Sequence, residues 1–466
     1  MTNAATWEAN IIPREQPTGF YTYPHLEAGY FGQALLYRGV NDADQLLTWS
    51  RLMQVVITLS TGLVIFGWAR SLSNNTGGLI ALTTWVFNPM ALAYGHLVIT
   101  DPGLAFTFAL ALWAFNRFAA QPNPMRATLA GLTIALALLT KYVAVILLPV
   151  CAVVAGLHIW RDRSEGRQWL VGLSVMALTC YGVILLCYAP YWAPPPAITA
   201  EMAAHLKVPT WFTTSRLVLV PRDYFRGLAL MLVHAKQGHL AYLCGEWSER
   251  GWWYYFPVAL ALKTPVALLG LAGLCRVSRR DGRLVPLLGA LIFLGFAMTS
   301  HADIGVRHVL PVFPLLSVVI GASVAKASRR MQIAGWILCG WLAVAAVRSC
   351  PDYIPYFNEV AGGAARGHEY LVDSNLDWGQ DVKRLKTYVE RHHTEKLSGS
   401  YFGPGGALAY YGIPFTGMDA QELATLHDAD VVVSATWLMR PEYAWLRQQH
   451  EPVARVGHGL FVYRLP

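Results

Sequence analysis

The sequence predicts a mainly α-helical, polytopic membrane protein with a small C-terminal α/β domain on the extracytoplasmic side. The composition indicates this class, because 55% of the 466 residues are hydrophobic and only 14% are charged, whereas soluble domains carry roughly 25% charged residues. Apolar stretches also recur at lengths near the ~20 residues that a helix needs to cross a bilayer. The residues after 348 lack such stretches and mix charged with apolar positions, which is typical of a water-exposed domain.

Ten apolar stretches are candidate spans, and the fourth and fifth are short enough to form one unit broken around Lys141. They cover residues 51–70, 77–97, 102–118, 127–140, 143–160, 168–190, 255–275, 284–300, 308–326 and 331–348. Basic residues concentrate in alternate loops, at Arg117 and Arg126, Arg161, Arg163 and Arg167, Arg276, Arg279, Arg280 and Arg283, and Lys326, Arg329 and Arg330. Cytoplasmic loops carry an excess of Lys and Arg, so these loops are predicted to be cytoplasmic. This distribution argues against a nucleic-acid partner, although the net charge is +8.

This topology divides the chain into three parts. Residues 1–50 are the remainder of a first outer loop, residues 51–348 are the transmembrane part with a long outer loop at 191–254, and residues 349–466 are the outer domain. The first part is either translocated unaided or follows a helix that precedes this sequence, and we favour the second interpretation. In the outer domain, which ends with "VYRLP", 396–403 and 430–436 are expected strands, and the spacing of 380–393 predicts a helix.

A single carboxylate, Asp101, interrupts an apolar region that has no other charged residue between 71 and 116. One interpretation is a helix N-cap, because Pro102 follows it and proline suits the first helical position. The other is a functional acid at the outer membrane boundary, since ionisable groups near lipid depth are costly and usually serve a function. The two interpretations are compatible, and we take Asp101 as the candidate catalytic residue.

Three basic side chains are also predicted at outer ends of spans: Lys141, Arg307 and His308. A lysine or arginine at a span end is often only an anchor at the lipid surface. Arginine is well suited to phosphate oxygens because its planar fork donates two parallel hydrogen bonds. We therefore predict that these residues converge on the phosphate of an anionic headgroup, with scattered anchors as the alternative.

Two further stretches are candidate substrate contacts. The aromatic-rich segment 245–265 suits a membrane-interface belt or a sugar face and contains Glu246 and Trp252. The segment "DSNLDWGQD" concentrates acids, amides and a tryptophan, and from it we single out Asp373, Asn375, Asp377 and Trp378. The alternative is a polar loop in which Asp377 or Asp381 caps the next helix. A divalent cation, Mg²⁺ or Mn²⁺, would suit an acid-lined phosphate site, but no ligand set is evident.

Taken together, seven segments resemble one enzyme family. They are "NDADQLLTWSRL", "ITDPGLAFTFALAL", "ALLTKYVAVILLP", "GEWSERGWWYYFPVALALKTP", "DIGVRHVLPVFPLL", "YFNEVAGG" and "DSNLDWGQD". Their order resembles that of bacterial polyprenol-phosphate-dependent glycosyltransferases of family 39, the protein O-mannosyltransferase-like group with the membrane glycosyltransferase type C fold. The resemblance implies transfer of one sugar from a polyprenyl-phosphate donor to a protein, lipid or glycan acceptor at the outer face of the cytoplasmic membrane.

The resemblance also implies residue roles. Asp101 matches the acid of the second outer loop, Lys141 matches a lysine between short spans, and Arg307 with His308 matches an "RH" pair. In such enzymes an acid of the first outer loop is the general base, and basic residues stabilise the phosphate leaving group. This sequence lacks the helix, the Asp-Glu pair and the "HPPL"-like motif with which the family usually opens.

That departure leaves alternatives to an active glycosyltransferase. The sequence either lacks its start or belongs to an inactive relative that binds sugar lipids. A transporter or flippase is a third interpretation, but it would place charges at mid-membrane along a path. Here most charges lie at span ends on one face, so a membrane glycosyltransferase is the leading hypothesis.

Overall fold

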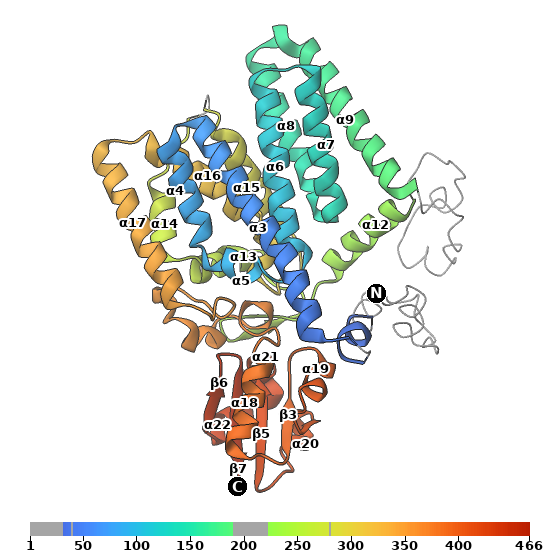
Figure 1. Ribbon diagram of the computed structural model, residues 1–466, viewed down its shortest axis with the longest axis vertical. Helices are drawn as coiled ribbons and strands as arrows, with labels where there is room; N and C mark the ends of the chain where they lie inside the picture. The colour runs from blue at the N-terminus through green and yellow to red at the C-terminus, as the bar shows by residue number, and fades with distance from the viewer. Residues whose placement is uncertain (1–30, 39–40, 190–221, 279–280) are drawn as a thin grey trace.

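The computed structural model describes residues 31–38, 41–189, 222–278 and 281–466. Apolar helices form one end of the molecule, and a small mixed sheet flanked by short helices forms the other (Figure 1). The predicted fold class, a mainly α polytopic membrane protein with a C-terminal α/β unit, is confirmed. The predictions for residues 1–30 and 190–221 lie outside the described residues.

The helices of the apolar part account for each predicted span. Among the described residues, five helices are long and apolar enough to cross a membrane. A sixth span results if one bent pair of helices counts as a single unit. Shorter apolar helices occupy three more predicted positions. The elements are η1 (Ala34–Arg38), α3 (Ala43–Leu72), α4 (Asn75–Val86), α5 (Pro89–Tyr94), α6 (Thr100–Ala120), α7 (Pro124–Thr140), η2 (Tyr142–Ile146), α8 (Leu147–Arg161), η3 (Arg163–Glu165), α9 (Gly166–Tyr188), α12 (Arg222–Gln237), α13 (Tyr255–Lys263), α14 (Val266–Gly273), α15 (Leu284–Ala297), η5 (Val306–Val309), α16 (Val312–Ala325) and α17 (Arg329–Arg348).

The predicted span 77–97 is divided into α4 and α5 at Asn88. Proline cannot donate a helical hydrogen bond and is tolerated mainly in the first turn, so Pro89 begins a new helix rather than continuing α4. The Asn88 side chain accepts a hydrogen bond from the Met90 N–H and caps that helix. Lys141 likewise separates two helices, because its extended backbone lies between α7 and η2.

Small residues allow the central helices to approach closely. Gly77 on α4 faces Gly321 on α16, and a Cβ on either glycine would crowd the backbone carbonyl of the other. On α7, a Cβ at Gly131 would lie 2.6 Å from the Met176 carbonyl oxygen of α9. Helix pairs in membranes often pack through such small residues because lipid offers no hydrophobic drive for association.

A sharp break separates α13 from α14, whose axes differ by 110°. Pro265 causes it, since proline lacks an N–H and forces the preceding Thr264 into an extended conformation. Asn358 donates from Nδ2 to the carbonyls of Ala261 (2.5 Å) and Thr264 (2.9 Å) and so satisfies groups that the break exposes. The segment "YFNEVAGG" thus has a structural role at the break.

The C-terminal part contains a five-stranded sheet in the order β4-β3-β5-β7-β6. β3 pairs in parallel with β4 and β5, and β7 pairs antiparallel with β5 and β6. Both predicted strands and the predicted helix are present, as β3, β5 and α18. The elements are η6 (Glu359–Ala361), η7 (Ala364–Glu369), η8 (Asp373–Asn375), α18 (Val382–His392), β3 (Leu397–Ser400), α19 (Gly405–Tyr410), β4 (Phe415–Gly417), α20 (Ala420–Leu423), β5 (Ala429–Ser434), α21 (Ala435–Leu438), η9 (Pro441–Tyr443), α22 (Ala444–Gln449), β6 (Ala454–Val456) and β7 (Leu460–Leu465).

Two smaller features join the parts. A hairpin of β1 (Ala241–Leu243) and β2 (Glu246–Ser248) lies against the C-terminal part, where Trp247 donates from Nε1 to the Met439 carbonyl at 3.0 Å. At the start of α3, Asp44 accepts from the Tyr411 hydroxyl (2.6 Å) and pairs with Lys383 on α18 (2.8 Å). These contacts fix the α/β unit against the end of the bundle at which α6 begins.

Candidate active site

Asp101 lies in the first turn of α6 and is only 1% exposed. The N-cap of this helix is Ile99, and no side chain makes a capping hydrogen bond there. The interpretation of Asp101 as a helix cap is therefore wrong. Its carboxylate is engaged by side chains from other segments of the chain instead.

Two of the predicted cations meet at Asp101. Lys141 Nζ lies 2.5 Å from Asp101 Oδ1, and Arg307 Nη1 lies 3.2 Å from Oδ2. The partners are 40 and 206 residues from Asp101 in the sequence, so tertiary folding brings them together. Counting formal charges, one carboxylate and two cations leave a net charge of +1. We name Asp101, Lys141 and Arg307 the outer cluster.

Each cation is held at a break between helices. Lys141 occupies the extended residue where α7 ends and η2 begins, so its side chain leaves the helical register. Arg307 lies in η5, the short turn between α15 and α16. Lys141 keeps about a quarter of its side-chain surface exposed, at 26%. The cluster therefore pairs a buried acid with cations that still reach solvent or a ligand.

His308 lies next to Arg307 and interacts electrostatically with Asp101. Burial, together with the positive charges of Arg307 and Lys141, lowers the pKa of His308 to about 3. Its Nε2 atom is buried and has no hydrogen-bond partner among the described residues. At neutral pH His308 is thus an uncharged imidazole that could donate or accept one hydrogen bond, and it adds no positive charge.

The segment 373–378 lies directly behind Arg307. Ser374 Oγ accepts a hydrogen bond from Arg307 Nε at 3.1 Å, and the Trp378 ring lies 4.6 Å from the guanidinium carbon. Asn375 and Asp377 are fully buried, so neither side chain reaches a surface in this structure. Asp373 has a left-handed backbone (φ 57°), and its N–H donates to Thr436 Oγ1. Of the four predicted substrate contacts in this segment, only Trp378 touches the outer cluster.

The alternative in which Asp377 or Asp381 caps the next helix is also wrong. Asp381 is the N-cap residue of α18 by position, but its side chain makes no capping hydrogen bond. Asp377 Oδ1 accepts from the Gly379 N–H at 3.1 Å. Burial raises the pKa of Asp377 to about 7, against the opposing effect of that hydrogen bond. These buried acids pack between the loop and the sheet rather than at a helix end.

The remaining predicted contacts lie on the β1–β2 hairpin side. Glu246 is exposed on β2, and no contact among the described residues joins it to the outer cluster. The Trp252 N–H donates to Asp303 Oδ2 at 2.7 Å, five residues before His308. Burial raises the pKa of Asp303 to about 6. Trp252 thus anchors the segment that carries Arg307 and His308.

The requirement for a divalent cation stays a prediction. No group of three or more His, Cys, Asp or Glu side chains in the described ranges could hold one. At Asp101, both carboxylate oxygens are already taken by cations. Mg²⁺ is bound through protein carboxylates and substrate phosphates, and the Asp101 carboxylate is already paired with two cations. We therefore describe no reaction step that uses a metal ion.

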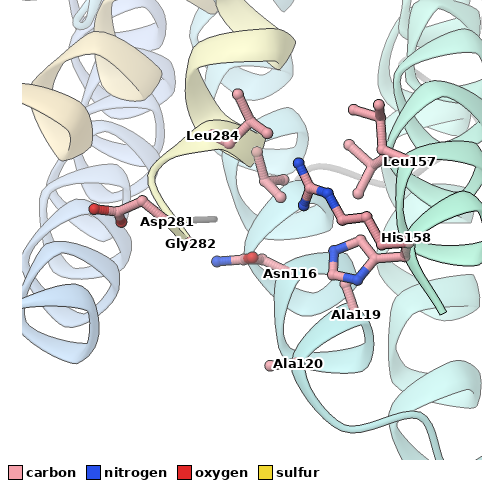
Figure 2. A pocket seen from close by; sticks show the side chains of 11 residues that line it. Asn116, Ala119, Ala120, Leu157, His158, Asp281, Gly282 and Leu284 are labelled. Atoms are coloured by element: carbon pink, nitrogen blue, oxygen red, sulfur yellow. The ribbon is translucent and has the colours of Figure 1, made fainter. Parts of the chain in front are cut away.

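A cavity of about 190 Å³ lies at the opposite end of α6. Figure 2 shows Asn116 and His158 facing this space from α6 and α8, with Asp281 and Gly282 on the other side. Asn116 follows Asp101 by 15 residues on one helix, which corresponds to about 22 Å along its axis. The cavity is therefore separate from the outer cluster.

Some residues at the site were not singled out from the sequence. Ser374 bonds Arg307, and the Tyr94 hydroxyl donates to the Ser374 carbonyl at 2.7 Å. Lys263, the last residue of α13, donates from Nζ to the carbonyls of Ile354 (2.8 Å) and Asn375. Ser374 lies inside the segment "DSNLDWGQD". Its position between Asp373 and Asn375, which were singled out there, was the signal that the sequence offered.

A bundle of apolar helices that holds a buried acid and two cations beneath an α/β unit is a multi-pass membrane protein with a cluster of net positive charge. Residues 44–193 match the family model of dolichyl-phosphate-mannose-protein mannosyltransferases, a range that includes Asp101 and Lys141. This match covers 150 of the 466 residues and agrees with the resemblance carried by the motifs, which is to membrane glycosyltransferases of the protein O-mannosyltransferase-like kind.

The comparisons with curated proteins and with solved structures found either no match or a distant one. No curated protein matches the sequence. The crystal structure of ArnT from Cupriavidus metallidurans bound to undecaprenyl phosphate is similar with 15% identity and a TM-score of 0.46, over 93% of this chain and 86% of that one. AglB, an archaeal oligosaccharyltransferase from Archaeoglobus fulgidus in complex with an inhibitory peptide and a dolichol-phosphate, is similar with 13% identity and a TM-score of 0.41, over 95% and 66%.

Proposed function

We propose that this protein transfers a sugar from a polyprenyl-phosphate donor to an acceptor at the outer face of the cytoplasmic membrane, and that the outer cluster binds the donor phosphate. The observation that carries the proposal is the meeting of Lys141 and Arg307 on the buried carboxylate of Asp101. The arrangement puts two cations at one end of the apolar helices, where a lipid headgroup would lie.

The chemistry of the transfer needs positive charge at this point. The bond between sugar C1 and the phosphate oxygen breaks, a bond forms between C1 and the acceptor oxygen, and the acceptor hydroxyl loses its proton to a base. The donor phosphodiester carries one negative charge, whereas a phosphate monoester carries about −1.5 to −2 at pH 7. Cations preorganised around the phosphate therefore stabilise the departing polyprenyl phosphate more than the bound donor.

The geometry supports a holding role for Asp101 rather than a base. Each of its two oxygens accepts a hydrogen bond from a cation, Lys141 or Arg307, and these charges favour the ionised form of the carboxyl group. A carboxylate between two cations offsets their mutual repulsion and fixes their spacing. The candidate catalytic residue of the sequence prediction thus acts, in this proposal, by positioning the two phosphate-binding cations.

The orientation of the protein follows from the distribution of basic loops. The loop at 121–123, residues 162–165 and the loop at 326–328 all lie at the end of the bundle away from the α/β unit (Figure 1). Since basic loops favour the cytoplasm, this distribution supports an outward-facing outer cluster and α/β unit. The proposed acceptor is a protein, lipid or glycan. A requirement for Mg²⁺ or Mn²⁺ is tested separately, by adding EDTA to the transfer assay.

The test uses purified protein with labelled polyprenyl-phosphate sugars and follows the release of polyprenyl phosphate. We expect Lys141→Met to lower kcat/KM for the donor about 10- to 100-fold, the cost of a lost hydrogen bond to a charged group. Lys326→Met is the matched control, because Lys326 lies at the end of α16 that is farther from Arg307. This substitution should leave turnover unchanged. Saturable donor binding without turnover would show a non-catalytic sugar-lipid-binding protein instead.

A further inference from the structure

We propose that Ser374 is a positioning residue that aims the Arg307 guanidinium at the donor phosphate. The inference rests on the proposed function of the outer cluster and extends it to the segment 373–375, which belongs to the C-terminal part of the chain. Ser374 itself touches no substrate in this proposal. It acts by fixing which edge of Arg307 faces the site.

Ser374 and Asn375 grip the short segment that carries Arg307. Ser374 Oγ donates to the Ile304 carbonyl at 2.7 Å and accepts from Arg307 Nε at 3.1 Å. Asn375 Oδ1 accepts from the Val306 N–H at 2.9 Å. Because side-chain bonds from two adjacent residues reach residues 304, 306 and 307, the turn that presents Arg307 is fixed along its length.

Close packing adds to this grip. A Cβ on Gly305 would overlap Ser374 Oγ, so any larger residue there would displace the serine hydroxyl from its present position. The glycine in "DIGVRH" therefore leaves room for the close approach of the Ser374 side chain. It brings the serine hydroxyl within reach of the guanidinium.

The gripping segment is itself anchored to the helices. The Tyr94 hydroxyl donates to the Ser374 carbonyl at 2.7 Å, and Lys263 Nζ donates to the Asn375 carbonyl. Asn375 Nδ2 donates to the Tyr255 hydroxyl at 2.9 Å. Contacts with α5 and with both ends of α13 therefore hold Ser374 and Asn375 in place, and Arg307 is positioned against the body of the protein.

Three neighbours then define the plane of the guanidinium. Ser374 accepts a hydrogen bond from Nε, Asp101 accepts one from Nη1, and the Trp378 ring lies 4.6 Å from the guanidinium carbon. Among the described residues, Nη2 has no hydrogen-bond partner, so it is the donor left for a phosphate oxygen. A long arginine side chain loses much rotamer entropy on binding, and fixing it beforehand removes that cost from donor binding.

The test is a double-mutant cycle with Arg307→Lys, because lysine has no Nε for Ser374 to hold. We expect Ser374→Ala to lower kcat/KM for a labelled polyprenyl-phosphate sugar about fivefold to tenfold, as for one lost hydrogen bond. In the Arg307→Lys background the same substitution should cost less than twofold. Ser434→Ala is the control, since Ser434 is a buried serine that accepts from the Phe402 N–H.

An equal loss from Ser374→Ala in both backgrounds would show a merely structural role and overturn the proposal. If Ser374→Ala does not fold, Ser374→Cys enters the same cycle, because it keeps the side-chain volume and weakens the hydrogen bond.

If the wild-type protein shows no turnover with any donor, the proposed function fails instead. The cycle is then read from binding of polyprenyl phosphate alone, where a loss of affinity confined to the Arg307 background still supports the positioning role.

Discussion

Two ion clusters lie at opposite ends of the helical bundle and have the same formal composition. The outer cluster pairs Asp101 with Lys141 and Arg307. At the other end, Asp281 pairs with Arg283 and, at 3.9 Å, with Lys326. Each has one carboxylate and two cations. They differ in how the chain assembles them.

The Asp281–Arg283 pair of the inner cluster is local, and only Lys326, at the end of α16, comes from a distant part of the sequence. The Arg283 N–H and Nε both donate to Asp281, two residues earlier, at 3.0 and 2.6 Å, and Arg283 Nη1 donates to Ser323 Oγ at 3.0 Å. Such bonds close the turn that leads into α15. The outer cluster joins residues 40 and 206 positions apart and keeps Lys141 partly exposed. A cluster that closes its own turn serves the fold, whereas one assembled from distant breaks is available for a ligand.

The largest expected difference between the clusters comes from removing one arginine at each end. Arg307→Met should lower kcat for sugar transfer about 10²- to 10³-fold, the usual cost of one donor to a developing oxyanion. Arg283→Met should leave kcat within about threefold but lower the Tm, because it leaves Asp281 short of a buried partner. Turnover by both variants in detergent, with Tm measured in parallel, checks the comparison. Equal losses of turnover would mean that the two clusters do not differ in function.

Removing the acid from each cluster should give the next largest difference. Asp101→Asn releases Lys141 and Arg307 from a fixed spacing, and misplaced catalytic groups can cost about 10²-fold, so we expect kcat to fall about 10- to 100-fold. The net charge of the cluster rises from +1 to +2, so affinity for polyprenyl phosphate should stay equal or tighten. Asp281→Asn is the control and should leave both parameters unchanged. Unaltered turnover in Asp101→Asn would show that the site is assigned wrongly.

Much of this contrast could be predicted from the sequence. The end of each span was evident from hydropathy and from the basic loops, and that placed Asp101, Lys141 and Arg307 on one face. Their meeting follows because a membrane confines span ends to two planes. The division of 77–97 was also readable from Asn88 before Pro89, a capping residue followed by a helix-starting proline.

The support for the cluster could not be predicted in the same way. Ser374 is a neutral residue in a polar loop, and its bond to Arg307 spans 67 residues between two parts of the chain. Asp377 has the composition of a binding residue but is fully buried. Sequence pattern gives the residue type and the membrane face, whereas burial and hydrogen-bond partners depend on how the α/β unit docks.

A third experiment separates the outer cluster from the buried acids behind it. Burial raises the pKa of Asp377 to about 7, so the folded protein holds a proton there that the unfolded chain releases near pH 4. This contribution to stability is full below about pH 4 and is lost as the pH rises through about 7. We expect the Tm to fall from pH 5 to pH 8, and Asp377→Asn to reduce that fall by about 3–6 °C. Asp428→Asn, an exposed aspartate on the same unit, should change nothing.

The smallest expected effect concerns the two histidines near the clusters. Because burial lowers the pKa of His308 to about 3, His308 stays neutral between pH 5 and 8 and acts through hydrogen bonds alone. His308→Gln retains a neutral side chain that can hydrogen-bond, so kcat/KM should fall no more than about fivefold, with an unchanged pH profile. His158→Gln, which alters the cavity at the inner end, should have no effect on turnover. If His308→Gln abolished an ionisation between pH 6 and 7, His308 would carry charge during catalysis, and the outer cluster would hold three cations rather than two.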